Sequence, residues 1–401
     1  MIEIPHAIRQ AALALQRDTE APLAAYLYDL PALDAHLERL RADLPERVEL
    51  YYAVKANPDP RLLGRVAAVV DGLEVASGGE LDLIAPWRGE KPFLFGGPGK
   101  LDEEIAAALT QGVAALHVES AGELERVIAQ AEARRQAAPV LLRLNPRLPA
   151  AMRTRLTMAG QATAFGIDPE TLPTVIERAK ASRWIDLQGF HVHALSHQLD
   201  AERHLAMLDH LLDTCHALAQ HHGVTLRTLN LGGGIGVNYR EPARQYDWAR
   251  FAAGLHERLH HPALREGQLR FELGRYLTAF CGYYLMEVMD LKRNHGQWFA
   301  ICRGGTHQFR LPPAQGHSHP CIRLAGCRTL PGTPALRQAE VTVAGQLCTP
   351  KDILARDCPV ETLAVGDLLL FPLAGAYAWN ISHQAFLCHP APRFHYLEER
   401  P

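Results

Sequence analysis

The stretch Tyr51-Tyr52-Ala53-Val54-Lys55-Ala56-Asn57 reads as a buried strand that delivers one lysine at its end, and the rest of the chain is organised around it. Residues 47–54 are rich in β-branched, aromatic and apolar side chains, which predicts a buried strand, and Asn57-Pro58-Asp59-Pro60 ends it at once. Lys55 therefore stands at the carboxyl end of a strand. A lysine held there, half out of water, can act as an amine nucleophile toward a carbonyl carbon. For this stretch alone, a solvated lysine at a strand end is the alternative.

Short apolar runs alternate with longer helical patterns from about residue 30 to residue 275, which predicts βα units and a parallel sheet. Eight candidate strands fall at residues 48–54, 72–76, 92–96, 114–118, 139–144, 187–193, 227–231 and 269–273. Eight such units predict an α/β fold, a closed TIM-like (β/α)8 barrel, in which catalytic groups come from the carboxyl ends of the strands.

The sequence pattern changes after residue 276. The segments there are β-rich and separated by Pro and Gly, and no regular crossover helices are predicted between them. We therefore predict three parts: residues 1–29 as an N-terminal segment that packs with the β domain, residues 30–275 as the barrel, and residues 276–401 as a C-terminal antiparallel β domain. Strands are expected at 281–291, 298–303, 340–344 and 368–371. Tyr26-Leu27-Tyr28 is expected to form a strand outside the barrel.

Composition excludes several classes of protein. The 401 residues carry a formal net charge of −3 with no long run of one sign, so we expect no nucleic-acid partner. The apolar pattern within residues 1–29 is interrupted by Arg9, Gln16 and Arg17, so we expect neither a signal peptide nor a membrane span. The eight cysteines lack paired metal-type spacing, which predicts reduced thiols and a cytoplasmic protein.

Two groups at the ends of the last strands can bind an anion. Gly232, Gly233 and Gly234 follow the seventh strand, where barrels hold phosphate, although a glycine triplet alone is often only a tight turn. Glu272 on the eighth strand is expected to point into the barrel mouth, and Arg275 can bond the same phosphate. An internal Glu272–Arg275 pair is the alternative.

The sixth predicted strand, residues 187–193, carries two histidines. Alternation places His191 and His193 on one face, which is the barrel interior. No third ligand follows at metal spacing, so we expect no metal, and a flat ring that packs on another ring is the better use of His193. An amine, an anion cradle, a carboxylate and an imidazole together fit a phosphorylated aldehyde cofactor, pyridoxal 5'-phosphate.

With these motifs the sequence resembles the fold type III pyridoxal-phosphate decarboxylases, which include the ornithine, arginine and diaminopimelate enzymes and share an alanine racemase-like barrel. The similar segments are residues 52–57, 74–81, 191–196, 232–234, 272–275, 345–348 and 375–377. The resemblance implies that Lys55 holds the cofactor as a Schiff base and that His193 stacks on its ring. It further implies cofactor contacts from Ser77, Arg143, Ser196, Gly232, Gly233, Gly234, Glu272, Gly274, Arg275 and Tyr377.

The resemblance also implies the chemistry and the assembly. Glu272 keeps the pyridine nitrogen protonated, which favours α-decarboxylation through a quinonoid intermediate over racemisation. Cys348, lent by the partner subunit of a homodimer with shared active sites, or Lys55 returns a proton to the carbon. His193, Lys55 and Cys348 are thus the expected catalytic residues.

The sequence departs from the family at its specificity segment. Cys348-Thr349-Pro350 lacks the acid that faces a distal ammonium in the diaminopimelate and ornithine enzymes, and Leu195 replaces a glycine before Ser196. His307 and Arg310, in residues 304–312, suit an anionic, oxygen-rich tail, although a polar loop on a β domain is the alternative.

These departures resemble the branch of the family found in siderophore biosynthesis. The expected substrate is a citrate-conjugated diaminopropionate, with His307, Arg310 and Thr349 binding it. The alternatives are a diaminopimelate or other diamino-acid decarboxylase, a non-catalytic decarboxylase-like binding protein, and a phosphate-binding barrel without Schiff-base chemistry.

Overall fold

The computed structural model describes residues 4–152, 157–328 and 332–398. The chain forms two compact units. One comprises His36–Val237 and Tyr246–Leu277, and the other comprises the chain up to Ala35, Asn238–Gln245 and the chain from Thr278 onward.

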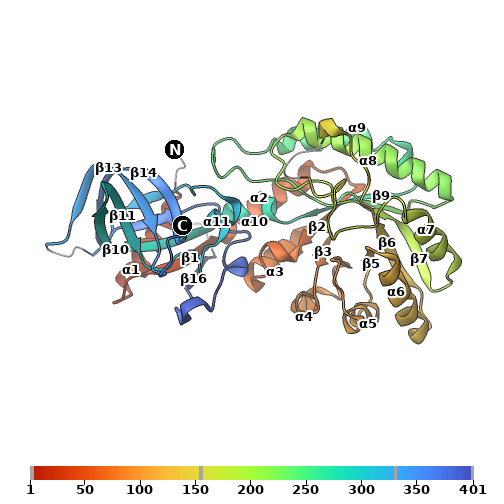
Figure 1. Ribbon diagram of the computed structural model, residues 1–401, viewed down its shortest axis with the longest axis horizontal. Helices are drawn as coiled ribbons and strands as arrows, with labels where there is room; N and C mark the ends of the chain where they lie inside the picture. The colour runs from red at the N-terminus through yellow and green to blue at the C-terminus, as the bar shows by residue number, and fades with distance from the viewer. Residues whose placement is uncertain (1–3, 153–156, 329–331, 399–401) are drawn as a thin grey trace. The chain divides into compact units, whose positions relative to one another are not determined.

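The first unit is a closed barrel of eight parallel strands in chain order (Figure 1). The strands are β2 (Val48–Ala53), β3 (Gly72–Val75), β4 (Phe93–Phe95), β5 (Ala115–Val118), β6 (Ala138–Arg143), β7 (Ile185–His191), β8 (Thr228–Asn230) and β9 (Gln268–Leu273). The barrel closes because β9 pairs with β2 as well as with β8. The prediction of eight strands and a closed barrel is confirmed, and each predicted strand end lies within two residues of the observed one.

Helices follow most of these strands. They are α3 (Pro60–Val69), α4 (Gly78–Leu83), α5 (Asp102–Thr110), α6 (Ala121–Arg134), α7 (Leu172–Ala181), α8 (Ala201–His222) and α9 (Trp248–Arg258). Pro60, which marks the end of the first strand motif in the sequence, begins α3, and the carboxylate of Asp59 caps it by accepting from the amides of Arg61 and Leu62. Among the described residues, no helix is long and apolar enough to cross a membrane.

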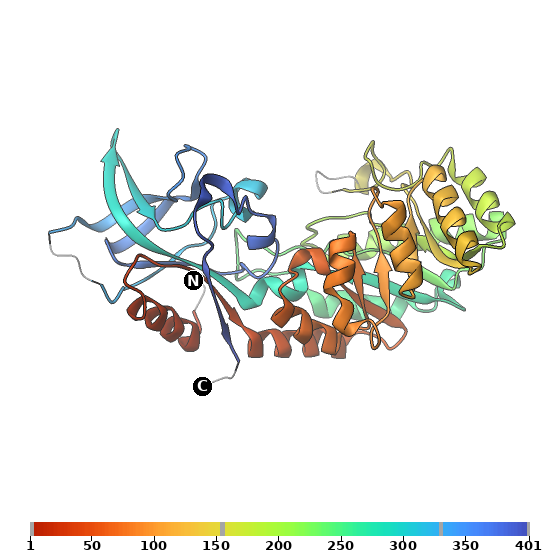
Figure 2. The same cartoon turned by 90° about the horizontal axis from the view of Figure 1, so that it is seen from below.

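The second unit is a β domain with the strand order β12-β15-β10-β11-β13-β14, extended by β1 and β16. Figure 2 shows this unit from a second side. Its strands are β1 (Ala24–Asp29), β10 (Gly282–Asn294), β11 (Gln297–Cys302), β12 (Ile322–Leu324), β13 (Ala335–Ala344), β14 (Ile353–Ala364), β15 (Leu368–Phe371) and β16 (Arg393–Leu397). The four expected strands correspond to β10, β11, β13 and β15, whereas β12, β14 and β16 were not predicted.

Most pairings in this sheet are antiparallel, as expected, but β1–β16 and β11–β13 are parallel. The long connection from Cys302 to Ala335 makes the second of these possible, because parallel neighbours need a crossover rather than a hairpin. Helix α1 (His6–Arg17) buries Ile8 and Ala12 in the same apolar cluster as Leu27 of β1 and Leu285 of β10. Residues 24–29 thus form the strand outside the barrel that the sequence predicts.

Candidate active site

Lys55 lies directly beyond the end of a barrel strand. Strand β2 ends at Ala53, and a single 3-10 turn, Val54–Ala56, carries the lysine. Its Nζ lies 2.5 Å from Oε2 of Glu74 on the neighbouring strand β3. The Glu74 side chain is 4% exposed and the Lys55 side chain 45% exposed, so a buried carboxylate holds an amine that a ligand can reach.

Glu272 on β9 stands at the centre of a buried polar group. Its Oε1 accepts a 2.7 Å hydrogen bond from Nδ2 of Asn230, the last residue of β8. Nε2 of His117 on β5 lies 3.6 Å from Oε1, and Nε2 of His191 on β7 lies 3.7 Å from Oε2. Glu272 is 7% exposed, and the Asn230 side chain supplies a hydrogen-bond partner for its buried carboxylate.

Burial dominates the electrostatics of this group. It raises the pKa of Glu272 to about 7; the charge of Glu74 adds to this effect, and Lys55 opposes it. Burial also lowers the pKa of His117 and of His191 well below the ordinary value, so both imidazoles are neutral near pH 7. Nδ1 of His117 and both ring nitrogens of His191 have no hydrogen-bond partner among the described residues. Orphaned buried nitrogens of this kind mark a place where a ligand is expected.

His193 lies on the loop after β7, because that strand ends at His191 and not at residue 193 as predicted. The half-buried ring accepts a 3.3 Å hydrogen bond at Nδ1 from the amide of Gly233. Burial lowers the pKa of His193 to about 3, and Arg143 contributes further. The ring is therefore a neutral, flat group, as stacking on a cofactor requires.

The glycine loop packs too closely for side chains. A Cβ on Gly232 would lie 2.4 Å from His193 Nδ1, and one on Gly233 would lie 2.0 Å from the carbonyl oxygen of Glu272. The amide of Gly232 donates to Oδ1 of Asn230 at 2.9 Å, and that of Gly233 donates to His193. Two of the three glycine amides, those of Gly232 and Gly233, are thus bonded within the protein.

Three other predicted contacts already have structural roles. Arg143, at the end of β6, pairs with Glu119 at 2.7 Å and lies 4.7 Å from the centre of the Phe165 ring. The Ser77 hydroxyl caps helix α4 by accepting from the amide of Glu80. Gly274 lets the end of β9 approach the lysine segment, because a Cβ there would lie 2.7 Å from that of Ala56.

Two further predicted contacts belong to the same unit. Ser196 is half-buried on the loop after β7, and its side chain makes no hydrogen bond to the described residues. Arg275 is the first residue of the short helix α10 (Arg275–Thr278). The barrel unit therefore gathers Lys55, Arg143, His193, Glu272 and the glycine loop.

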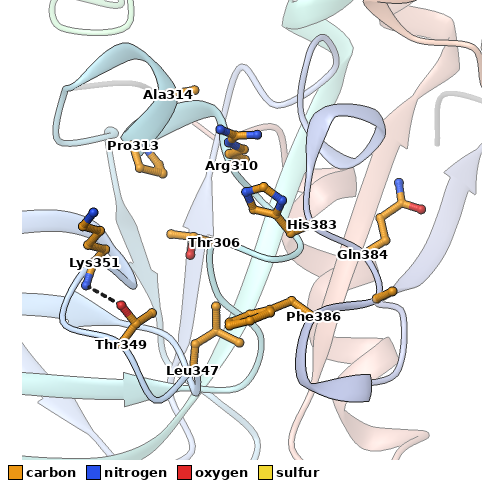
Figure 3. A pocket seen from close by; sticks show the side chains of 11 residues that line it. Thr306, Arg310, Pro313, Ala314, Leu347, Thr349, Lys351, His383, Gln384 and Phe386 are labelled. Carbon is orange, nitrogen blue, oxygen red and sulfur yellow. Dashed lines mark hydrogen bonds between the residues drawn. The ribbon is translucent and has the colours of Figure 1, made fainter.

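The remaining predicted residues lie in the β domain. Cys348 is an exposed free thiol, and Tyr377 is half-buried with a positive φ of 50°. Arg310 and Thr349 line one pocket of about 810 Å³ (Figure 3). His307 is not among the residues that line it: the ring is 1% exposed and lies 5.0 Å from that of His389.

Sequence reasoning missed three polar residues of the barrel interior: Glu74, His117 and Asn230. Each lies on a predicted strand, and a polar side chain in an otherwise apolar strand was the available signal. His117 and Asn230 are 0% exposed, so these are buried polar groups and not surface residues.

The comparisons with known proteins bear on the whole chain. Residues 30–279 match the family model described as "Pyridoxal-dependent decarboxylase, pyridoxal binding domain". The chain belongs to the pyridoxal-dependent decarboxylase family.

Individual relatives agree with this family. The chain is 40% identical, over 94% of its length and 95% of the relative, to the 2-[(L-alanin-3-ylcarbamoyl)methyl]-2-hydroxybutanedioate decarboxylase of Staphylococcus aureus. It is 33% identical, over 92% of its length and 88% of the relative, to the diaminopimelate decarboxylase of Deinococcus radiodurans. The crystal structure of diaminopimelate decarboxylase from Helicobacter pylori complexed with L-lysine has the same fold, with a TM-score of 0.83 at 24% identity over 96% of this chain and 94% of that one.

The residues of this decarboxylase fit pyridoxal phosphate. The site presents a reachable amine on Lys55, a buried carboxylate on Glu272 and unpartnered imidazole nitrogens. The ligand atoms of His117, His191 and Glu272 also lie within 4.8 Å of one another, close enough to hold a metal ion. A carboxylate that serves the pyridine nitrogen cannot also serve a metal, and the family favours the cofactor.

Proposed function

We propose that this decarboxylase removes the α-carboxylate from a citrate-conjugated diaminopropionate, in siderophore biosynthesis. The relative with 40% identity is named for a substrate of this kind. The observation that carries the proposal to this chain is the pocket beside Cys348, whose lining residues include Arg310 and Lys351 but no Asp or Glu. A tail bearing carboxylates suits such a lining, whereas a bare ammonium tail does not.

When bound, pyridoxal phosphate supplies an electron sink for the electron pair left behind as carbon dioxide departs. The protein's side chains position the cofactor and the Lys55 amine and set the protonation state of the cofactor ring. Asn230 orients the Glu272 carboxylate, which would stabilise a protonated pyridine nitrogen, and the neutral His193 ring would pack against the flat face of the bound cofactor. Glu74 keeps the Lys55 amine in place.

The reaction needs one proton at the α-carbon to replace the lost carboxylate. Two groups can supply it: Sγ of Cys348 and Nζ of Lys55. Cys348 is exposed, as a thiol that meets a substrate must be. Its position in the β domain supports the further proposal that each active site is shared in a homodimer, to which the partner lends Cys348.

The protein is proposed to work in the cytoplasm. All eight cysteines are free thiols, which suits a reducing compartment.

The first test is carbon dioxide release by the pyridoxal-phosphate-loaded protein, with Lys55→Ala as the blank. The panel comprises diaminopimelate, ornithine, lysine, arginine, diaminopropionate and its citryl conjugate. We expect release from the conjugate. Release mainly from diaminopimelate, the activity named for the relative from Deinococcus radiodurans, would replace the proposed substrate. No release from any compound despite bound cofactor would favour a binding protein.

The shared site has its own test. Lys55→Ala and Cys348→Ala homodimers are each expected to be nearly inactive. Mixing them through a dissociation and reassociation step should restore about a quarter of wild-type activity, because half the dimers are mixed and each has one intact site. No recovery, with mixed dimers shown by mass, would contradict shared sites.

A further inference from the structure

The β domain contains a pocket of which only two lining residues, Arg310 and Thr349, were predicted from the sequence to bind substrate. Its volume is about 810 Å³, and it is lined by Thr306, Arg310, Pro313, Ala314, Leu347, Thr349, Lys351, His383, Gln384, Ala385 and Phe386. Figure 3 shows these side chains around one hollow, supplied by three separate segments of the chain.

The charge of this lining has one sign. Arg310, Lys351 and His383 are its titratable side chains, and it contains no carboxylate. All three are exposed, and none forms an ion pair within the described part of the chain. Other cationic side chains of the β domain do have an acidic partner, as Arg323 has in Asp367. Cations from separate segments, gathered in a hollow without an internal counter-ion, form a receptor for an anion.

A buried carboxylate holds the walls of the pocket together. Asp352 is 2% exposed, and its Oδ1 accepts from the amide and hydroxyl of Thr306 at 2.6 and 2.8 Å. Its Oδ2 accepts from the amide of Leu347 at 2.8 Å. The acid next to the pocket is therefore engaged in the backbone of two walls and does not neutralise the cations.

A hydrogen bond also joins the third wall of the pocket, residues 383–386, to the wall that carries Arg310. The amide of Arg310 donates a 3.0 Å hydrogen bond to Oγ of Ser382, the residue before His383. The segments that carry Arg310 and His383 are thus tied to each other. The lining also includes apolar surface from Leu347 and Phe386, which suits the methylene groups between carboxylates.

Chain connectivity places the pocket beside the expected proton donor. Leu347 and Thr349 both line it, and they flank Cys348. We infer that this pocket binds a polycarboxylate group of the substrate, with Arg310 and Lys351 as its charged anchors and His383 as a third contact. This inference rests on the proposed function and adds Lys351 and His383 to the residues that the sequence indicates.

The test uses citrate as the probe and the cofactor-loaded full-length protein. Calorimetric titration at low ionic strength should show citrate binding, and Arg310→Gln and Lys351→Gln should each weaken it about tenfold, the effect of losing a charge-assisted hydrogen bond. The matched controls are Arg337→Gln and Lys292→Gln, exposed residues outside the pocket, which remove the same charge. Equal effects from pocket and control variants, or none from either, would overturn the inference.

Kinetics separate this inference from the proposed function. The ratio of kcat/KM for the citryl conjugate to kcat/KM for diaminopropionate should fall about tenfold in Arg310→Gln or Lys351→Gln. Turnover of the conjugate with an unchanged ratio would keep the proposed function and discard the pocket. Pocket-dependent citrate binding without turnover of the conjugate would keep the pocket and discard the proposed substrate. Unchanged melting temperatures would confirm that these surface variants are folded.

Discussion

The side-chain amide of Asn230 donates a 2.7 Å hydrogen bond to Oε1 of Glu272, and the same side chain accepts a 2.9 Å hydrogen bond from the amide of Gly232. One buried residue thus orients the carboxylate of β9 and the first turn of the glycine loop. Its hydrogen bond also opposes the rise in the pKa of Glu272 that burial causes. Asn230 is therefore placed to keep Glu272 ionised.

Asn230→Ala is expected to reduce kcat/KM for decarboxylation by about tenfold or more, the cost of a lost hydrogen bond to a charged group. Because the pKa of Glu272 should rise further, the acid limb of the rate profile should move to higher pH. The measurement is kcat/KM against pH. Asn294→Ala, at an exposed position at the end of β10, is the control. A reduced rate with an unmoved acid limb would show that Asn230 only supports packing.

Gly233→Ala should destabilise the barrel, because the new Cβ would lie 2.0 Å from the carbonyl oxygen of Glu272. Overpacking of this kind costs about 1–3 kcal/mol in the free energy of unfolding, measured by urea denaturation. Gly122→Ala is the contrasting control, since nothing lies within 4 Å of a Cβ there and the position is helical. That variant should gain about 0.5–1 kcal/mol. Equal stability of the two variants would contradict the close approach at Gly233.

Asp352→Ala should lower the free energy of unfolding by about 2 kcal/mol, because it leaves the half-buried donors of Thr306 and Leu347 without their acceptor. Chemical denaturation measures this, and citrate binding should weaken as the pocket walls loosen. Asp290→Ala, an exposed residue of β10, should change stability by less than about 0.5 kcal/mol. A stable Asp352→Ala protein with intact citrate affinity would show that the walls hold without this carboxylate.

Stability should fall in mild acid. Burial lowers the pKa of His204 and of His319 to about 3. Both rings stay neutral in the folded protein, whereas the unfolded chain binds protons near pH 6.5. Each therefore costs about 1.4 kcal/mol of stability per pH unit as the pH falls below 6.5 toward 3. Glu272, whose pKa is raised to about 7, has the opposite effect between about pH 4.5 and 7.

The measurement is urea denaturation at pH 7.5, 6.5 and 5.5. His319→Gln serves as the comparison, because it removes one titrating ring together with its bond to the Pro372 carbonyl. Below pH 6.5, the slope of its free energy of unfolding against pH should be smaller than that of the wild type by up to about 1.4 kcal/mol per pH unit, the contribution of one proton. A free energy of unfolding that is the same at all three pH values would refute the assignment of neutral buried histidines.

The predicted strands show how far local pattern reaches. All eight barrel strands could be predicted from short apolar runs that alternate with helical patterns, because a buried parallel strand is apolar along its whole length. Strand β14 escaped detection: it is long, contains Pro359 and turns through a positive φ at Asp357, so its alternation is broken. The end of β7 was placed too late, since His193 continues the apolar pattern after the ladder has stopped.

The barrel, the family resemblance and the position of Lys55 at a strand end could all be predicted from local sequence pattern, because they depend on residues that are neighbours along the chain. Only the tertiary structure brought His117, His191 and Asn230 around Glu272, and Lys351 and His383 into one pocket with Arg310. Barrel closure joins inward side chains from strands far apart in sequence, and loop packing gathers cations from separate segments. No local period encodes either arrangement.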